Sequence, residues 1–415
     1  MLLYNVGVWL YAFTIRIASL FNPKAKLWVE GRKNWKSKLK SGMSGVENPI
    51  WMHCASLGEF EQGRSVIEKI KEQFPQQKIL LSFFSPSGFE IRKDYDLADY
   101  VCYLPIDSKK NAFDFIDICK PKAVIFVKYE FWINYLNELQ KRNIPTYLIS
   151  SVFKEHQPFF KWYGGIFRKA LGCYKTIFVQ DKKSLNLLEG LKVKTAILNG
   201  DTRIDRVSKI KETAYENQFI SQFSSGNFVI VAGSTWPKDN VLIVESFHLL
   251  KKNHPKLKLI IALHEVENKN VDALIKLLDA AKLTHVLITE TNQNLKSDVL
   301  IINTIGILSL IYRYGNIAYI GGGFDNGIHN ILEPSVYGLP VVFGPNHQKF
   351  IEAEEMLSLK SAVQINNSSQ LTQTISTFMN DKDAYSNSSN NCISYINKGK
   401  GATDKIITEV FNIVK

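Results

Sequence analysis

Residues 316–334 read NIAYIGGGFDNGIHNILEP, which combines a strand-like run with a glycine-rich loop. An apolar run typical of a buried strand ends in three glycines, and a helix is predicted to begin near His329, with Glu333 one turn in. Glycine lets a ligand approach the backbone closely, and a helix N-terminus favours an anionic group. Three adjacent glycines also cost backbone entropy on folding. We therefore interpret the loop as a ligand site in which Glu333 can accept hydrogen bonds from two ribose hydroxyls.

Similar apolar runs recur along the chain, separated by stretches long enough for crossover helices. This alternation is typical of doubly wound parallel sheets. The strands are predicted at residues 78–84, 123–127, 146–149, 176–179, 195–198, 228–232, 257–262, 285–288, 299–302, 316–320 and 341–343. The Ser/Asn-rich run 386–391 is predicted to be a surface loop.

The order of these runs predicts two α/β domains, each of the Rossmann-like, doubly wound type. We place an N-terminal anchor and basic segment at residues 1–44 and a first α/β domain at residues 45–205. A helical linker follows at residues 206–225, a second α/β domain at residues 226–395, and a closing amphipathic helix at residues 396–415. Two such domains facing a cleft are a common plan for nucleotide-sugar transferases, with ligands beyond the carboxyl ends of the strands.

Composition and net charge limit the classes of protein to which the chain can belong. The chain has 415 residues, is 45% hydrophobic and 22% charged, and carries a formal net charge of +12. These values exclude a disordered, collagen-like or polytopic membrane protein. The excess positive charge favours anionic partners such as nucleic acid, phosphorylated metabolites or an anionic membrane. Five widely spaced cysteines without a CxxC pair argue against a disulfide framework or a structural zinc site.

The N-terminus differs from the rest of the chain. Residues 1–15 carry no charge, Arg16 interrupts the apolar run, and seven basic residues follow between Lys24 and Lys40. A basic segment after a hydrophobic helix stays on the cytoplasmic side and is attracted to anionic lipid. We interpret the segment as a membrane anchor, either spanning or interfacial, at the cytoplasmic membrane. The alternative is a buried first helix of the domain.

Three motifs of the first domain could carry chemistry. Glu59 follows a strand and a glycine turn in ASLGEF, where it can serve as a general base or merely favour a helix start. Glu130 follows another strand in KYEFWIN, whose aromatic residues suit either a sugar platform or the core. Arg203 in NGDTRID can hold a phosphate or carboxylate, or pair with Asp201 or Asp205.

The second domain opens with AGST at residues 232–235, after its first strand. Gly233 and Ser234 form a turn that can bind a single phosphate group or simply cap a helix. The sequence contains neither a P-loop nor a GxGxxG fingerprint at this place.

Several motifs, in their order along the chain, resemble those of the 3-deoxy-D-manno-octulosonic acid (Kdo) transferases of lipopolysaccharide synthesis. These enzymes are inverting glycosyltransferases of GT-B fold. The matching motifs are ASLGE (55–59), SPSG (85–88), YLPID (103–107), EFWIN (130–134), AGST (232–235), GGGFDNGIHNILEP (321–334) and VVFGPN (341–346).

This resemblance implies CMP-Kdo as donor and the lipid A precursor, lipid IVA, as acceptor. It makes residues 45–205 the acceptor-binding domain and residues 226–395 the CMP-sugar-binding domain. It makes Glu59 the general base, and Glu130 and Arg203 groups that steady the transition state. The implied donor-binding residues, besides the AGST turn, are Leu263, His264, Ile305, Gly306, Ile307, Asn330, Ile331, Leu332 and Glu333.

The chain departs from the family at three places. Many members have Pro-Arg-His at Leu263-His264-Glu265, Met-Gly-Glu at residues 305–307, and His instead of Trp236. The missing arginine removes one cation from the donor phosphate unless His264 or Lys238 replaces it.

The expected enzyme is a membrane-associated Kdo transferase of the inner membrane, with its catalytic domains in the cytoplasm. We expect no metal and no other cofactor, because CMP-sugars carry one phosphate and no DxD pair lies in a suitable place. One alternative is another GT-B transferase that uses a UDP-sugar on a lipid or cell-wall acceptor. A nucleic-acid binder is the other alternative, but no nucleic-acid motif supports it.

Overall fold

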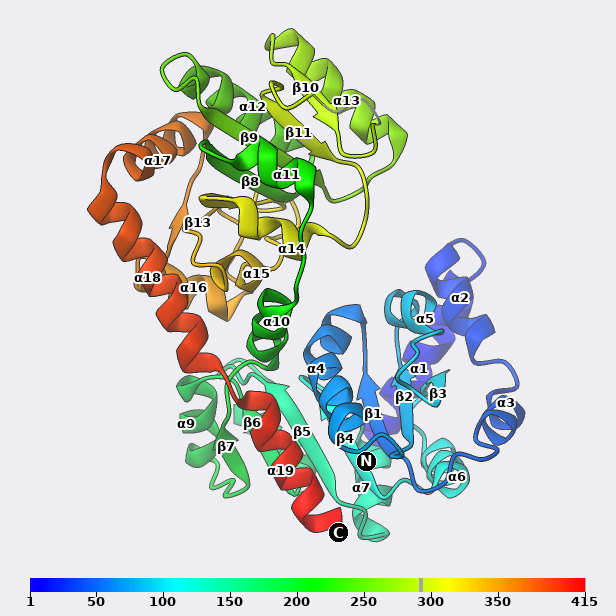
Figure 1. Cartoon of the computed structure of the whole chain (residues 1–415). Coiled ribbons are helices and arrows are strands. Elements are labelled where there is room, and N and C mark those ends of the chain that lie inside the picture. Colours follow the sequence, from blue (N-terminus) through cyan, green and yellow to red (C-terminus); the bar gives the residue numbers. More distant parts are fainter. Residues whose placement is uncertain (291–293, 415) are drawn as a thin grey trace. The chain divides into compact units, whose positions relative to one another are not determined.

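The computed structural model describes residues 1–290 and 294–414 (Figure 1). These residues form two parallel sheets of seven strands each. The first sheet has the order β3-β2-β1-β4-β5-β6-β7. Its strands are β1 (Ile50–Cys54), β2 (Ile79–Phe83), β3 (Tyr100–Tyr103), β4 (Ala123–Val127), β5 (Thr146–Ser151), β6 (Thr176–Val179) and β7 (Ala196–Leu198).

The second sheet has the order β10-β11-β9-β8-β12-β13-β14. Its strands are β8 (Phe228–Thr235), β9 (Leu257–Leu263), β10 (His285–Leu287), β11 (Val299–Ile302), β12 (Ile317–Ile320), β13 (Val341–Phe343) and β14 (Ala362–Gln364). Both sheets are doubly wound, so the predicted α/β class is confirmed.

Helices follow most strands. Those of the N-terminal part are α1 (Leu2–Ala18), α2 (Pro23–Gly31), α3 (Trp35–Gly42), α4 (Leu57–Gln73), α5 (Pro86–Arg92), α6 (Lys109–Cys119), α7 (Ile133–Lys141), the 3₁₀ turn η1 (Pro158–Phe160), α8 (Gly165–Leu171), α9 (Lys182–Gly190) and α10 (Thr202–Glu212). The remainder are α11 (Gln218–Ser224), α12 (Pro237–Lys251), α13 (Asn268–Ala280), α14 (Leu308–Ile311), η2 (Tyr312–Tyr314), α15 (Leu332–Ser335), α16 (Ile351–Ser358), α17 (Ser368–Asn380), α18 (Lys382–Gly399) and α19 (Ala402–Val414).

Successive side chains of a strand point to opposite faces of the sheet, and here both sets are buried, so helices cover both faces. In β1, Trp51 belongs to one buried cluster, whereas Ile50 and Met52 belong to another. A parallel strand that is buried on both faces reads as a continuous apolar run, which is why these strands could be predicted from sequence. Gly63 brings α4 close to β1, because a Cβ there would lie 2.8 Å from Met52 Sδ.

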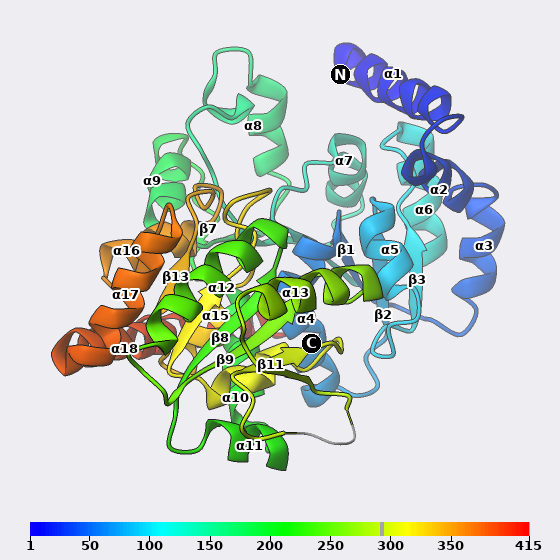
Figure 2. The ribbon, with the colours of Figure 1, turned by 90° about the horizontal axis from the view of Figure 1, so that it is seen from above.

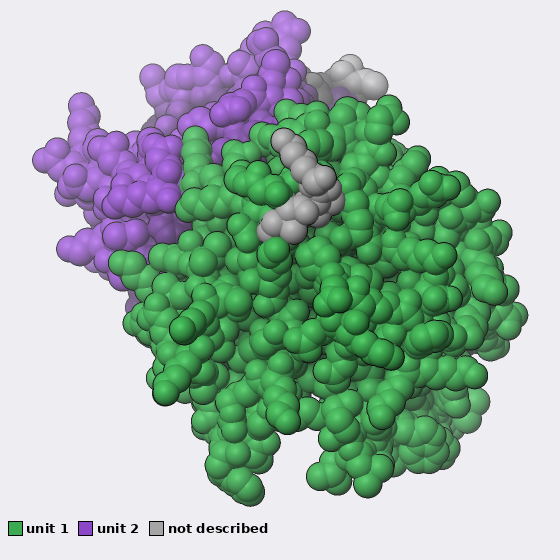
Figure 3. Space-filling view, turned by 90° about the horizontal axis from the view of Figure 1, so that it is seen from below, with its two compact units in different colours: residues 1–205, 400–415 green, residues 206–399 purple. Residues whose placement is uncertain are grey.

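The chain forms two compact units, residues 1–205 with 400–415, and residues 206–399 (Figure 3). The predicted closing helix is therefore largely α19, and it belongs to the first unit. Phe411 of α19 stacks on Phe74 with ring centroids 3.9 Å apart. Asp205 accepts the backbone N–H groups of Gly401 and Thr403, each at 2.7 Å, and so satisfies the start of α19.

Helix α1 packs one face on the first unit and leaves the other exposed. Tyr4 donates a hydrogen bond to Asp107 at 2.5 Å, and Asn134 donates one to Asn5 at 3.0 Å. The opposite face exposes large apolar side chains, among them Leu2, Leu3, Trp9, Phe13 and Ile17. Within the described residues, no helix has both the length and the apolarity to cross a bilayer.

Two local predictions were wrong or incomplete. The Ser/Asn-rich run 386–391 lies inside helix α18 rather than in a loop. The edge strands β3 and β14, which have four and three residues, were not predicted.

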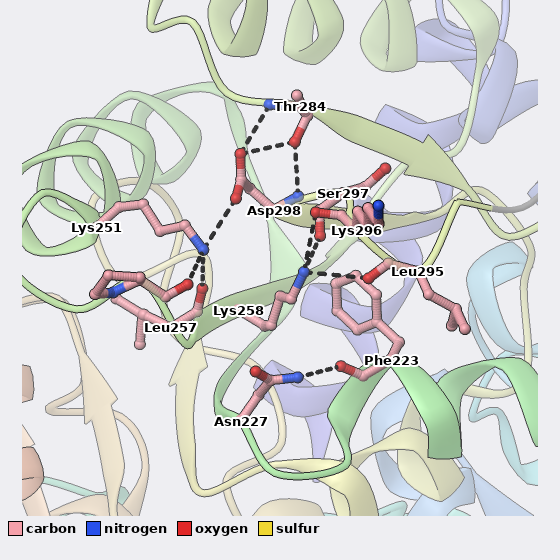
Figure 4. A network of polar contacts seen from close by, with 11 residues as sticks. Phe223, Asn227, Lys251, Leu257, Lys258, Thr284, Leu295, Lys296, Ser297 and Asp298 are labelled. Atoms are coloured by element: carbon pink, nitrogen blue, oxygen red, sulfur yellow. Dashed lines mark hydrogen bonds and ion pairs between the residues drawn. The ribbon is translucent and has the colours of Figure 1, made fainter.

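A buried lysine ties β9 to the segment before β11 (Figure 4). Lys258 is only 7% exposed, and its ammonium donates to the carbonyl oxygens of Leu295 and Lys296 at 3.2 Å and to that of Ser297. It also lies 4.9 Å from the centre of the Phe223 ring. Burial lowers the pKa of Lys258. The lysine thus satisfies three carbonyl groups of one connection.

We expect Lys258→Met to destabilise the second unit by about 3 kcal/mol, because buried carbonyl groups lose a charged donor. Thermal or urea unfolding measures the loss. Lys256→Met, two residues away and exposed, is the matched control and should change stability little. Equal stability of the two variants would contradict a structural role for Lys258.

Candidate functional site

Glu59 lies in the first turn of α4, directly after the carboxyl end of β1. Ser56, the residue before α4, donates its hydroxyl hydrogen to Glu59 Oε2. The Glu59 side chain is partly exposed. An oriented, accessible carboxylate at a strand end is placed as a general base requires.

Glu130 follows β4, the neighbour of β1 in the sheet, and is only 4% exposed. Trp132 Nε1 donates to Glu130 Oε2, and the Tyr174 hydroxyl donates to the Glu130 carbonyl. His53 Nε2 lies 3.1 Å from the same carboxylate oxygen, but without the alignment of a hydrogen bond. His53 Nδ1 is 2.8 Å from the hydroxyl of Ser82. Glu130 is thus held from several sides.

Cys54, the last residue of β1, is completely buried beside this part of the sheet. Burial raises the pKa of Cys54 well above its usual value, and the negative charges of Glu59, Glu130 and Glu61 raise it further. Lys128, which begins the loop to Glu130, has a φ of 75°. Such strain in a residue other than glycine is often found at functional sites.

Arg203 lies in the first turn of α10 and forms an ion pair with Asp201. Its Nε is 3.1 and 3.0 Å from the two carboxylate oxygens, and its Nη2 is 2.5 Å from Oδ2. Of the two partners considered from sequence, Asp201 pairs with Arg203, and Asp205 accepts the N–H groups at the start of α19. Thr202 donates to the carbonyl of Gln62 at 2.6 Å, which ties α10 to the helix that carries Glu59.

In the second unit, Gly233 and Ser234 form a bulge at the end of β8 rather than a separate turn. Ser234 has a φ of 53°. A Cβ at Gly233 would lie 2.0 Å from the Tyr312 hydroxyl, and one at Gly321 would lie 2.2 Å from the Ser234 carbonyl oxygen. The glycines here are required by close packing of backbone against neighbours, in addition to any role in ligand binding.

Asp239, in the first turn of α12, fixes the glycine-rich loop from inside. This buried carboxylate accepts the N–H groups of Trp236 at 2.9 Å and Gly322 at 2.8 Å, and the Tyr319 hydroxyl at 2.7 Å. Burial raises its pKa. Asp239 therefore joins the ends of β8 and β12.

Three rings stack beyond the ends of β8, β9 and β12. His264 lies between Trp236, at 4.6 Å, and His329, at 4.3 Å, measured between ring centroids. Trp236 Nε1 donates to His329 Nε2 at 3.1 Å. Burial lowers the pKa of His264, and lowers that of His329 to about 4. Burial thus favours the neutral form of both rings. Lys238 forms an ion pair with Asp325 at 2.7 Å.

The helix expected near His329 begins at Leu332 and has only four residues, so that prediction was wrong. Asn330 Oδ1 accepts the Leu332 N–H at 3.0 Å, and Asn330 Nδ2 donates to Glu333 Oε1 at 3.1 Å. The helix start is thus already capped by a side chain. Ile331 and Leu332 are buried, which leaves the partly exposed Asn330 and Glu333 as the polar groups of this loop.

The other predicted donor residues also lie at the carboxyl edge of the second sheet. Leu263 ends β9 and is buried, and Ile305, Gly306 and Ile307 form the connection between β11 and α14. Ile305 is 84% exposed, and Gly306 has a φ of 97°. Across residues 1–290 and 294–414, no three His, Cys, Asp or Glu side chains are grouped as metal ligands.

His53, Asp239 and the three-ring stack were not predicted from the sequence as parts of the site. A histidine inside the apolar run IWMHC is a signal for His53, and an acid three residues after Trp236 is the spacing of a helix cap. The stack joins rings from three loops, and no local pattern predicts it.

Comparison with known proteins identifies relatives of the chain. Residues 31–206 match the family described as 3-deoxy-D-manno-octulosonic-acid transferase (kdotransferase). The 3-deoxy-D-manno-octulosonic acid transferase of Aquifex aeolicus is 28% identical over 347 residues, covering 83% of this chain and 89% of the relative. That of Haemophilus influenzae is 24% identical over 372 residues, covering 86% and 85%. The resemblance seen in the motifs is confirmed.

Solved structures show the same fold. The UDP-GlcNAc 2-epimerase from Neisseria meningitidis bound to UDP-GlcNAc has a TM-score of 0.61 at 17% identity, covering 87% of this chain and 98% of that chain. MurG of Acinetobacter baumannii has a TM-score of 0.55 at 12% identity, covering 86% and 98%. The predicted GT-B class is confirmed.

Proposed function

We propose that the chain, a glycosyltransferase related to the Kdo transferases, transfers Kdo from CMP-Kdo to the lipid A precursor. This precursor is lipid IVA, and the reaction belongs to lipopolysaccharide core biosynthesis. The observation that best supports the proposal is the pair of carboxylates, Glu59 and Glu130, after the neighbouring strands β1 and β4. Both belong to motifs that also carry the family resemblance.

In the proposed mechanism, Glu59 removes the proton from the acceptor hydroxyl, and the Ser56 hydroxyl holds the carboxylate in position. The acceptor oxygen attacks the anomeric carbon of Kdo from the face opposite CMP. The bond to the phosphate oxygen of CMP breaks, and CMP leaves with the bonding electron pair. This single displacement inverts the anomeric configuration.

Glu130 and Arg203 act on the charges that develop in this step. A fixed carboxylate such as Glu130 stabilises positive charge at the anomeric carbon. Arg203 steadies negative charge, and Asp201 holds the plane of its guanidinium. Gly233, Ser234 and the Asn330–Glu333 segment contact the nucleotide. The proposal includes no metal, because CMP-Kdo carries a single phosphate.

Incubation of the purified full chain with CMP-Kdo and lipid IVA, followed by mass spectrometry of the lipid, tests the proposal. Lipid heavier by one or more Kdo units is expected, and NMR of the product gives the anomeric configuration. Binding of CMP and UDP is compared in parallel. Lipid of unchanged mass together with tighter binding of UDP would favour a UDP-sugar transferase instead.

We also propose that the protein associates with the cytoplasmic face of the inner membrane through α1. Contacts of Tyr4 and Asn5 hold one face of this helix on the protein, and the opposite apolar face remains exposed. Basic residues of the following segment, including Lys24, Lys26 and Lys38, suit anionic lipid. An apolar face and a basic neighbour are the two signals of an interfacial helix.

We expect Trp9→Ser/Phe13→Ser to weaken binding to anionic vesicles about tenfold or more, because both rings are exposed on the free face of α1 and stack on each other. Co-sedimentation with vesicles measures the change. The variant retains Tyr4 and Asn5, so its thermal midpoint should match that of the unmodified protein. Unchanged vesicle binding would contradict the role of α1.

Glu333→Ala should weaken CMP binding about 10- to 100-fold, because one or two charged hydrogen bonds to ribose hydroxyls are lost. Isothermal titration calorimetry measures the dissociation constant. Glu245→Ala, an exposed acid on α12, should leave it unchanged. Equal affinity of the two variants would mean that the ribose is bound elsewhere.

A further inference from the structure

An exposed aromatic pair projects from the first unit between η1 and α8. Trp162 is 91% exposed and Tyr163 58% exposed, and their rings meet edge to face with centroids 5.6 Å apart. Single exposed apolar residues are common on protein surfaces. Two adjacent aromatic residues, one of them almost completely in solvent, need an explanation.

The base of this loop is firmly packed. Phe159 is buried and lies 4.5 Å from Phe131 and 5.5 Å from Phe153, measured between ring centroids. Arg168 donates to the carbonyl oxygens of Phe159 at 3.0 Å and Lys161 at 2.7 Å. A close contact between two backbone segments lies at Gly164, directly after the pair.

A Cβ at Gly164 would lie 1.8 Å from the Pro158 carbonyl oxygen, so only glycine allows the backbone to close the loop there. The packing therefore fixes the loop in a form that turns Trp162 and Tyr163 outward while its other aromatic residues point into the core.

The pair lies at the same edge of the sheet as α1. The loop follows β5, and α1 packs over segments that follow β2, β3 and β4. An open pocket of about 360 Å³ lies there, lined by residues that include Tyr4, Val8, Phe84, Ile106 and Trp132. Because the strands are parallel, their carboxyl ends share one edge. Figure 2 shows α1 and the loop before α8 projecting from the same side of the first unit.

We propose that Trp162 and Tyr163 form a second membrane contact, which inserts into the headgroup region of an anionic bilayer beside α1. Indole and phenol rings are enriched at this depth of a membrane. Lys154, in the segment before η1, and Lys169, in α8, are exposed and suit anionic headgroups. A stable protein interface buries about 800 Å² on each partner, which two side chains cannot supply. A lipid surface needs no such area.

Two contacts on one rigid unit restrict how that unit can lie on a membrane. A single helix permits rotation about its own axis, whereas a helix and a separate loop define a plane. The inference rests on the proposed membrane association but not on the proposed sugar transfer, so the two can fail separately.

The test compares the full chain with W162S/Y163S on vesicles of phosphatidylethanolamine and phosphatidylglycerol. We expect an about tenfold lower partition coefficient, equivalent to about 1.4 kcal/mol, with an unchanged thermal midpoint. Leu249→Ser, which removes an exposed apolar residue from α12 of the other unit, should bind as the unmodified protein does. Vesicles of phosphatidylcholine alone should bind less of every variant.

A second measurement locates Trp162 directly. Brominated lipids quench tryptophan fluorescence on contact, so the unmodified protein should be quenched more than Trp162→Phe, which keeps an aromatic ring but loses this indole. Equal quenching together with equal partition of W162S/Y163S would overturn the proposal. Loss of binding in W9S/F13S but not in W162S/Y163S would retain α1 as the anchor and reject the second contact. A lower mass of W162S/Y163S in sedimentation velocity, with vesicle binding unchanged, would instead assign the pair to self-association.

If the unmodified chain does not bind vesicles, both membrane proposals are rejected. Turnover of CMP-Kdo with a soluble acceptor analogue then still tests the catalytic proposal on its own.

Discussion

Glu59→Gln is expected to lower kcat by a factor of about 10² to 10⁴, the usual contribution of a general base. Glutamine keeps the shape of the side chain and can accept the hydrogen bond from Ser56, but it cannot take a proton from the acceptor. Steady-state kinetics with CMP-Kdo and acceptor measure the loss. CMP affinity should be unchanged, because the predicted nucleotide contacts lie in the second unit.

Glu61→Gln is the matched control. Glu61 lies in the same helix and forms an ion pair with Arg92 at 3.1 Å, so its replacement should change kcat by less than about twofold, as for an ordinary surface pair. Near-normal turnover of Glu59→Gln, or an equal loss in both variants, would reject Glu59 as the base.

Asp239→Ala is expected to have the largest effect on stability, about 3 kcal/mol or more, because three buried donors lose their acceptor. Chemical unfolding of the full chain measures it, and CMP binding should weaken as well, since Gly322 is no longer held. The loss follows from the way one carboxylate joins the ends of two strands.

Asp239→Asn distinguishes hydrogen bonding from charge. An amide oxygen can accept the two backbone N–H groups while its NH₂ group donates to the Tyr319 hydroxyl, so this variant should be much closer to the unmodified protein. Because the pKa of Asp239 is raised in the folded protein, protonation of this carboxyl group stabilises the folded state at acidic pH. This contribution is lost as the pH rises through the folded-state pKa. The Asn variant should lack this pH dependence. Equal destabilisation by Ala and Asn would show that the charge itself is required.

Sequence reasoning recovered the central strands because burial on both faces makes them continuous apolar runs. It did not recover the short edge strands β3 and β14, although it did recover β7 and β10, which are also short and lie at sheet edges. Residues 386–391 were predicted as a loop because Ser and Asn favour turns. In α18 these residues mostly lie on the outer face, while Ser388, Cys392 and Ile396, spaced by four, are buried. Tertiary packing of that stripe overrides the local preference.

For the candidate site, the order of strands and loops predicted which side chains gather at each sheet edge. Glu59 and Glu130 follow neighbouring strands as expected. Contacts between distant segments could not be predicted: Asp205 accepts the N–H groups of Gly401 and Thr403, which lie about 200 residues further along the chain. The neutral state of His329 likewise depends on burial that only the folded structure provides.

The return of the chain to the first unit affects the order in which the protein can fold during synthesis. Residues 206–399 form a continuous segment, so the second unit can fold as soon as that segment has left the ribosome. The first unit is translated earlier but lacks α19, whose Ile406 and Val410 are completely buried beside β1 and β2. It must keep an apolar groove open until residues 400–415 emerge. The part of the protein that is made first is therefore completed last.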